Sequence, residues 1–198
     1  IPIEKTDSIF DHILVYRKDL PKQLNHKVCL LNKPYGVFSS CQNNNRRKTI
    51  LSLIPSHIRS SAHHVGRLDF DSKGDIILTN NVDLTIKLTH SKNSHAKTDQ
   101  VWLVGESSQL ILDNWRRRIL LDGKITMPAR IEVLDNSNRK IYLKVILKEG
   151  RNSQIRRIAT LIGHSVQDLQ RISISNIKLN GLQEEKLREL KKEKWNSI

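Results

Sequence analysis

The stretch 65–80, VGRLDFDSKGDIILTN, constrains the fold of this chain more than any other segment. Its glycine and polar residues at 71–74 stand between two extended pieces, a pattern that predicts a tight turn. Asp69 then lies at the rim of a sheet, where a strand holds its carboxylate in a fixed direction. Residues two apart in an extended segment share a face, so Arg67 can lie beside Asp69 and keep it ionised. Taken alone, the two residues also fit an ordinary surface ion pair beside a turn.

Two further motifs flank this stretch. Lys33-Pro34-Tyr35-Gly36 precedes it, and 149–157, EGRNSQIRR, follows it. Together with Gly66-Arg67-Leu68-Asp69 they resemble, in order, the three motifs of the pseudouridine synthases. The resemblance is greatest to the branch that modifies ribosomal RNA at single sites, the small-subunit enzyme and its large-subunit relatives. Weaker likeness continues as far as Leu190, so the resemblance covers most of the chain.

The resemblance implies an α+β fold, built on a mixed, mostly antiparallel sheet of about eight strands with flanking helices. The catalytic domain then occupies residues 27–198. Residues 1–26 resemble the tail of the small RNA-binding S4 domain that precedes the catalytic domain in many family members. Natural loss and trimming of the rest of that domain both fit the sequence.

The implied chemistry breaks the N-glycosidic bond of a uridine in RNA and rejoins the base through carbon. A carboxylate can act as nucleophile or base at the sugar, and no metal or organic cofactor is needed. The target base must leave its stack to be reached. The resemblance assigns the carboxylate to Asp69 and its partner cation to Arg156. It also implies a substrate-binding group that comprises Lys33, Tyr35, Arg67, Asp99, Arg151, Gln154 and Arg157.

Within that group, Lys33 and Tyr35 are expected to shape the floor of the pocket. Three arginines, at 151, 156 and 157, surround the start of a predicted helix. Free backbone N–H groups and guanidinium charge point the same way at such a helix start, which favours an anion there. We therefore expect this part of the third motif to contact the RNA.

The sequence departs from the family pattern most clearly at Asp99. The family carries a tyrosine in a Lys-x-Tyr segment at this place, and that tyrosine lies against the target base. Asp99 removes the aromatic face and adds a second carboxylate close to Asp69, so we expect Asp99→Tyr to raise activity. Asp75 and Val82 replace a leucine and a glycine that are usual in the family.

These departures support a second hypothesis, a catalytically degenerate RNA-binding or ribosome-assembly protein that retains the fold. Formation of pseudouridine in RNA distinguishes the two. A third possibility, a basic protein unrelated to these enzymes, requires the three ordered motifs to be coincidence.

The charge of the chain agrees with an RNA partner. Lys and Arg number 34 against 20 Asp and Glu, for a formal net charge of +14. Such an excess predicts a polyanionic partner, and no apolar run approaches the roughly 18 residues of a membrane span. We expect ribosomal RNA or a ribosomal precursor particle as the partner, and no membrane.

The two cysteines, Cys29 and Cys41, lack the spacing of a disulfide framework or a zinc site, and His63-His64 has no third metal ligand nearby. No metal site is therefore expected. The expectation is a monomer in a reducing compartment, the cytoplasm or an organelle matrix.

Several elements are predicted from patterning. Strands are expected at 27–32 and 101–104, and a hairpin over 131–147 turns at 135–138. Thr49 is expected to cap a short helix over 50–54. A second helix, with Trp115 in the core, is expected to be capped by Ser107 or Ser108. Alternation over 82–88 favours a strand by periodicity alone, whereas the resemblance implies a helix, which we adopt.

The remaining predictions concern one loop and two helices. The loop 42–48, QNNNRRK, is either solvated or in contact with phosphate through Arg46, Arg47 and Lys48. Asn152 or Ser153 is expected to cap a helix with an apolar stripe at 155, 158 and 162. A charged amphipathic helix is expected over 182–195.

Overall fold

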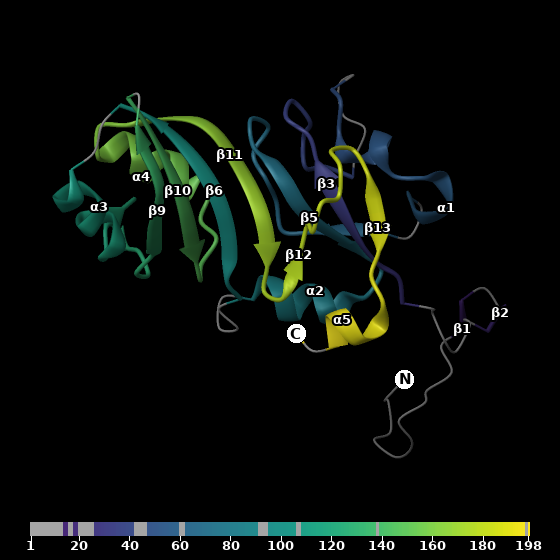
Figure 1. The fold of residues 1–198 in the computed structure, drawn as a ribbon. Coiled ribbons are helices and arrows are strands. Elements are labelled where there is room, and N and C mark those ends of the chain that lie inside the picture. Colours follow the sequence, from purple (N-terminus) through teal and green to yellow (C-terminus); the bar gives the residue numbers. More distant parts are fainter. Residues whose placement is uncertain are drawn as a thin grey trace, which may run out of the picture.

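The structure is a computed structural model that describes residues 14–15, 18–19, 26–41, 47–59, 62–90, 95–105, 108–137, 139–196 and 198. A nine-stranded sheet forms its centre (Figure 1). In spatial order, the main path of the sheet contains β13 (Leu187–Glu189), β3 (Val28–Lys33), β5 (Lys73–Thr79), β11 (Ser165–Ile174), β6 (Lys97–Val104), β10 (Lys140–Leu147) and β9 (Arg130–Ser137). β12 (Ile177–Lys178) pairs with β11, and β4 (His63–Val65) pairs with β5.

Nearly all strand pairs of this sheet are antiparallel. Within the described residues, the exception is the parallel pair of β11 with β5, where Arg171 lies opposite Gly74. Gly74 has φ +112, and a Cβ atom there would lie 2.1 Å from the Arg171 carbonyl oxygen. The close approach of the two strands therefore requires glycine. The observed sheet, with its flanking helices, confirms the mixed, mostly antiparallel α+β fold that the motifs predict.

The strands β3 and β5 lie inside the molecule with both faces covered. Val28, Leu30 and Ile77 pack with α2 (Val82–Thr89) and the C-terminal segment on one side. Cys29, Leu31, Ile76 and Leu78 pack on the other side with the 3₁₀ helix η1 (Ile50–Leu53) and the helix α1 (Ser56–Arg59). Burial of both faces explains why these strands read as continuous apolar runs.

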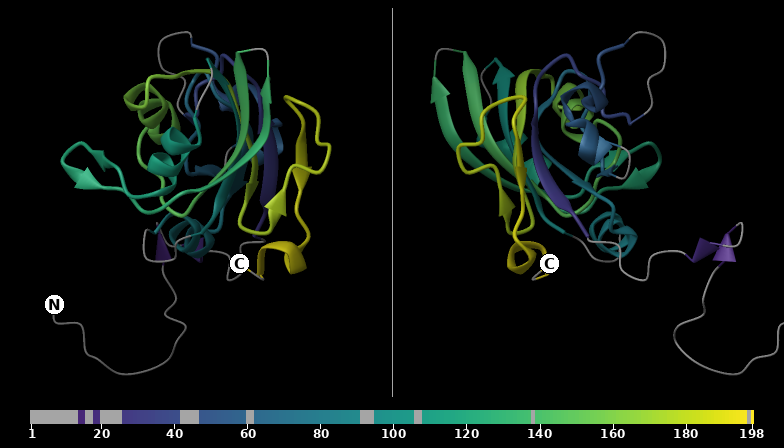
Figure 2. Two further views of the ribbon diagram at one scale, coloured as in Figure 1. Left: turned by 60° about the vertical axis from the view of Figure 1, so that its left-hand side comes forward. Right: turned by 90° about the vertical axis from the view of Figure 1, so that its right-hand side faces the viewer.

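The other half of the sheet has one covered face. The inward residues of β6 and β10 pack against α3 (Gln109–Arg116) and α4 (Gln154–Leu161), with Trp115 in the core as predicted. Figure 2 shows these two helices on the same side of the sheet. On the opposite face Trp102 stacks on Tyr142, with ring centroids 4.1 Å apart.

Two small hairpins complete the set of strands. β1 (Leu14–Val15) pairs with β2 (Lys18–Asp19) near the N-terminus, and β7 (Leu120–Leu121) pairs with β8 (Lys124–Ile125) beside α3. Among the described residues, no helix is long and apolar enough to cross a membrane.

The segment 82–88 is helical, as the resemblance implies and against its alternating pattern. Leu84 and Leu88, four residues apart, are buried, whereas Val82 and Ile86 are more than half exposed. Asn81 caps the helix, because its Oδ1 accepts a hydrogen bond of 2.9 Å from Leu84 N–H. Alternation was therefore a poor guide, since only every second apolar residue faces the core.

The predicted helix over 182–195 is wrong. The segment forms β13 and then the short helix α5 (Lys192–Asn196). β13 pairs with β3, with Leu187 opposite Leu31, and so covers the outer edge of a strand rich in apolar side chains. Hydrogen bonding along this edge favours a strand here. The local helix pattern could not predict it, because the partner strand β3 lies far away in the sequence.

Two predicted caps are also wrong. Thr49 stands before η1 without a side-chain cap bond, and Ser153 precedes α4 in the left-handed region, also without one. At the start of α4, Gln154 Oε1 instead accepts a hydrogen bond from Arg151 N–H. Ser108 does cap α3 through Ile111 N–H. The alternative cap Ser107 and the loop residue Arg46 lie outside the described residues.

Candidate active site

The second and third sequence motifs meet at a pocket of about 450 Å³. Its walls come from the turn after β4, the start of β6, the segment before α4 and the end of β11. The polar side chains that line it include Arg67, Asp69, Ser72, Lys97, Asp99, Glu149, Arg151, Gln154, Arg156 and Arg171. Six of the nine predicted site residues are thus brought together, and cationic side chains outnumber acids on this wall.

The corner that carries Asp69 is fixed by hydrogen bonds from Ser39 and Ser72. Ser39 Oγ donates to the Leu68 carbonyl at 2.7 Å and accepts from Leu68 N–H at 3.1 Å. Ser72 N–H donates to the Asp69 carbonyl at 3.1 Å and closes a turn over 69–72, two residues before the predicted turn at 71–74, because β5 already begins at Lys73. The carboxylate is therefore held by a rigid backbone at the rim of β5.

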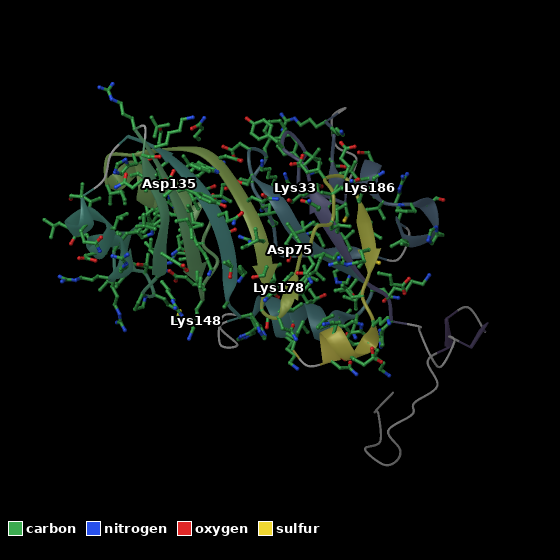
Figure 3. The ribbon with its side chains drawn as sticks, viewed as in Figure 1. Lys33, Asp75, Asp135, Lys148, Lys178 and Lys186 are labelled. Carbon is green, nitrogen blue, oxygen red and sulfur yellow. The ribbon has the colours of Figure 1, made fainter. Side chains whose placement is uncertain are left out.

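Lys33 supports the same corner from beneath. Its side chain is fully buried at the end of β3, next to β5, which carries Asp75 (Figure 3). The Nζ atom donates to the Ser72 carbonyl at 2.6 Å and to the Pro34 carbonyl at 3.0 Å. Burial lowers the pKa of Lys33 to about 8, against the opposing charges of Asp69 and Asp71.

The predicted pocket floor is therefore corrected. Lys33 lies behind the wall of the pocket rather than on its surface, and Tyr35 is 63% exposed on the outside. Neither side chain lines the pocket. Lys33 can act on the site through the Ser72 carbonyl and through its charge.

Arg156 reaches the Asp69 corner from α4. Its Nε lies 3.1 Å from Asp71 Oδ1, and its Nη2 donates to the Asp71 carbonyl at 2.7 Å and lies 3.4 Å from Ser72 Oγ. The expected partner was Asp69, so the ion pair is found two residues further along. Arg156 still lines the pocket beside Asp69 and holds the turn that presents it.

Arg67 and Asp69 share the pocket wall, but no ion pair joins the two in the described part of the chain. The Arg67 carbonyl instead lies 3.5 Å from Arg171 Nη1. The segment 66–69 is not part of a strand, so the rule that residues two apart share a face does not apply to it.

The third motif is tied together by Glu149. This carboxylate accepts from Gln154 Nε2 at 2.6 Å and lies 3.2 Å from Arg151 Nε. The Arg151 guanidinium also donates to backbone carbonyls of the β7–β8 hairpin, at Leu121, Lys124 and Ile125. Arg151 is thus engaged in structure, which leaves less of its charge for an anion than the sequence suggests.

Arg157 points elsewhere. It forms an ion pair with Asp122 and does not line the pocket. The three arginines of the predicted cluster at the start of α4 therefore bind three different partners, and of these only Arg151 and Arg156 border the pocket.

Asp99 lies in the pocket wall together with Asp69. It is fully buried, and its Oδ1 lies 3.1 Å from Arg171 Nε. Arg171 thus offsets the charge that Asp99 adds. Burial raises the pKa of Asp75 on β5 to about 7, with Arg171 acting against this rise and Asp99 adding to it.

Sequence reasoning missed Arg171 as a site residue. It lies on β11, whose parallel pairing with β5 brings it to the pocket from a segment without a motif. The one signal available was its place in the weaker likeness that follows the third motif.

Comparisons with known proteins agree with this geometry. The family model for RNA pseudouridylate synthase matches residues 27–160. Ribosomal large subunit pseudouridine synthase E of Vibrio parahaemolyticus is 34% identical over 173 residues, which cover 80% of this chain and 71% of that protein. Ribosomal large subunit pseudouridine synthase B of Bacillus subtilis is 34% identical over 163 residues, which cover 81% of this chain and 66% of that protein. A crystal structure of pseudouridylate synthase has a TM-score of 0.80 at 26% identity and covers 90% of this chain and 76% of that one.

A mixed sheet that presents an aspartate in an arginine-lined pocket, together with these matches, defines an RNA-modifying isomerase. The chain belongs to the RNA pseudouridylate synthase family. Its similarity to large-subunit synthases of the E and B types confirms the branch that the three motifs indicate.

Proposed function

We propose that this protein isomerises a specific uridine of ribosomal RNA to pseudouridine, with Asp69 as the nucleophile. The observation that carries this proposal is the position of Asp69. Its backbone segment is held by hydrogen bonds and forms one wall of a pocket rich in arginine. The names of the similar large-subunit synthases support ribosomal RNA as the substrate.

The reaction needs no second substrate, because uridine and pseudouridine are isomers. The bond from C1′ to N1 breaks, a bond from C1′ to C5 forms, and the proton on C5 leaves while N1 gains one. Asp69 supplies the carboxylate that enables bond cleavage. Arg156 and Lys33 act as positioning residues, since both bind the backbone of the turn at 71–72.

The charge of the pocket suits an RNA strand whose target base has left its stack. Arg67, Arg156 and Arg171 offer guanidinium groups close to Asp69. Such groups can bind the phosphates beside an extruded nucleotide. With a net charge of +14 the remaining surface adds attraction that does not depend on sequence.

The alternative of an RNA-binding or ribosome-assembly protein without activity is favoured by one observation, the buried Asp99–Arg171 pair at the place of the family tyrosine. For either function we propose a monomer in the cytoplasm or an organelle matrix. The free thiols of Cys29 and Cys41 suit a reducing compartment.

A map of pseudouridines in ribosomal RNA, from cells with and without the gene, tests the proposed function. We expect one modified position to disappear without the gene and to return when the parent chain is supplied. Identical maps in the two strains would contradict ribosomal RNA as the substrate.

Arg156→Ala is expected to lower turnover by about 100-fold, because a small displacement of a reacting group has effects of that size. RNA affinity should change much less. Arg157→Ala is the matched control, since the neighbouring arginine is paired with Asp122 away from the pocket. Rates under single-turnover conditions and equilibrium binding separate the two effects. Equal turnover in the two variants would remove Arg156 from the site.

The pH dependence of turnover should report on Lys33. Its pKa is about 8, so it loses its proton as the pH rises above that value. The neutral amine no longer offsets the charges of Asp69 and Asp71, and we expect turnover to fall above pH 8. Lys33→Met should be slower at pH 7 and should lack this decline. A parent profile that stays level through pH 9 would contradict the role of Lys33.

A further inference from the structure

Three aromatic side chains gather on the surface outside the pocket: Tyr35, Phe38 and Phe70, here called the aromatic patch. The ring centroids of Phe38 and Phe70 are 4.6 Å apart, and those of Tyr35 and Phe70 are 6.3 Å apart. Tyr35 is 63% exposed and Phe70 is 44% exposed. The rings thus form a continuous apolar surface that faces solvent on one side.

The fold does not account for this surface. The chain contains only 3 Phe, 3 Tyr and 3 Trp, so a third of its aromatic residues lie in one small area. Trp115 shows what a core aromatic looks like here, with 1% of its surface exposed. Exposed aromatic rings that touch one another are typical of binding surfaces rather than of structure.

The aromatic patch is joined directly to the catalytic corner. Phe70 follows Asp69 in the chain, and its carbonyl accepts a hydrogen bond of 2.9 Å from Gly36 N–H. Gly36 has φ +74, and a Cβ atom there would lie 4.0 Å from the Phe70 ring. Ser39, next to Phe38, holds both backbone polar groups of Leu68. Any molecule on these rings is therefore held at a fixed position relative to Asp69.

Positive charge borders the aromatic patch beside Phe38. The Arg47 guanidinium carbon lies 5.3 Å from the centroid of the Phe38 ring, within range of a cation–π interaction. Arg47 and Lys48 are both exposed. Aromatic faces next to cationic side chains fit the bases and phosphates of a single strand of nucleic acid.

We propose that the aromatic patch is a stacking platform for an unpaired base adjacent to the target uridine. The proposal rests on the proposed function, because it takes the occupant of the neighbouring pocket to be an RNA nucleotide. When a uridine leaves its stack, its neighbour loses a stacking partner. The Phe70 ring, one residue from Asp69, can replace that partner and so set the register of the RNA against the catalytic carboxylate.

The test uses an 11-nucleotide single-stranded RNA with a central uridine, a purine on each side and a fluorescent label at one end. Two further RNAs lack the base at the 5′ or at the 3′ neighbour of the uridine. Binding is measured with the Asp69→Asn protein, so that turnover does not disturb the equilibrium. The variants added to it are Phe70→Ala, Phe70→Trp and, as control, Leu110→Ala, an exposed apolar residue on α3 that lies outside the site.

We expect Phe70→Ala to weaken binding of the complete RNA by about 5- to 30-fold, in line with the loss of one stacked base. Leu110→Ala should have no effect, and Phe70→Trp should restore affinity. One of the two abasic RNAs should bind the Asp69→Asn protein more weakly by a similar factor, and adding Phe70→Ala should cause no further loss with that RNA. Such coupling between one side chain and one base would not arise from a loss of structure.

The proposal is overturned if Phe70→Ala weakens all three RNAs equally, leaves all three unchanged, or if no variant binds these RNAs. The proposal is also overturned if the molecule that covers Phe70 is found to be a protein and not an RNA. The stacking platform and the proposed function can fail independently of each other. Coupling without pseudouridine formation contradicts catalysis alone, whereas pseudouridine formation without coupling contradicts the platform alone.

Discussion

Asp69→Asn will abolish pseudouridine formation while RNA affinity stays within about threefold of the parent, since phosphate contacts supply most of the affinity. The amide keeps the shape of the carboxylate but can neither attack nor act as a base. Loss of a nucleophile lowers turnover by about 10⁴-fold or more in enzymes where it has been removed. The backbone around position 69 should not change, because its hydrogen bonds come from Ser39 and Ser72.

The control for this experiment is Asp83→Asn, an exposed acid in the first turn of α2. It removes the same charge without touching the pocket, and we expect parental turnover. Measurement of single-turnover rates beside equilibrium binding gives both quantities for each variant. Near-normal turnover of Asp69→Asn would remove Asp69 from the chemistry.

Asp99→Tyr will raise turnover and lower the stability of the fold. A ring at this position restores an aromatic face against the target base, and we expect turnover to rise by about 10-fold. Trp102 cannot already provide this face, because it lies on the opposite side of β6 and stacks on Tyr142. At the same time the variant leaves Arg171 without its carboxylate. Breaking such a buried pair lowers the free energy of unfolding by about 3 kcal/mol.

Asp99→Asn separates the ring from the charge. It breaks the ion pair with Arg171 and adds no aromatic face, so we expect lower stability and no gain in turnover. Thermal unfolding and single-turnover rates of both variants, beside the parent, test this directly. An equal gain in both variants would show that charge, rather than the missing ring, limits the parent. No gain in either would mean that position 99 does not contact the base.

Much of the central fold could be predicted from sequence because the patterns there are local. Buried strands such as β3 and β5 could be identified from their apolar runs. The turn after Asp69 was predicted two residues too late, because Lys73 and Gly74 already belong to β5. Where a segment depends on distant partners, the sequence was insufficient. The last part of the chain was predicted as a helix, yet Leu187 pairs with β3 across most of the chain length.

The candidate site shows the same division. Motif residues such as Asp69, Arg156 and Gln154 could be placed at one pocket, because the resemblance links their roles. Their individual partners could not be predicted. Arg156 binds Asp71 rather than Asp69, two residues further along the turn, and Arg151 is held by the β7–β8 hairpin. Arg171 could not be assigned to the site from sequence, because the parallel pairing of β11 with β5 that brings it there is not indicated by any local pattern.

The central claim, that this chain isomerises uridine in RNA, is tested most directly by release of tritium. Ribosomal RNA transcribed with uridine that carries tritium at C5 is incubated with the purified protein, and tritium in water is counted. Because C5 exchanges its hydrogen for the bond to C1′, each conversion releases one label. We predict release by the parent chain up to a fixed number of sites per RNA, and none by Asp69→Asn. Binding of the RNA by the parent chain without any release of tritium would contradict the account.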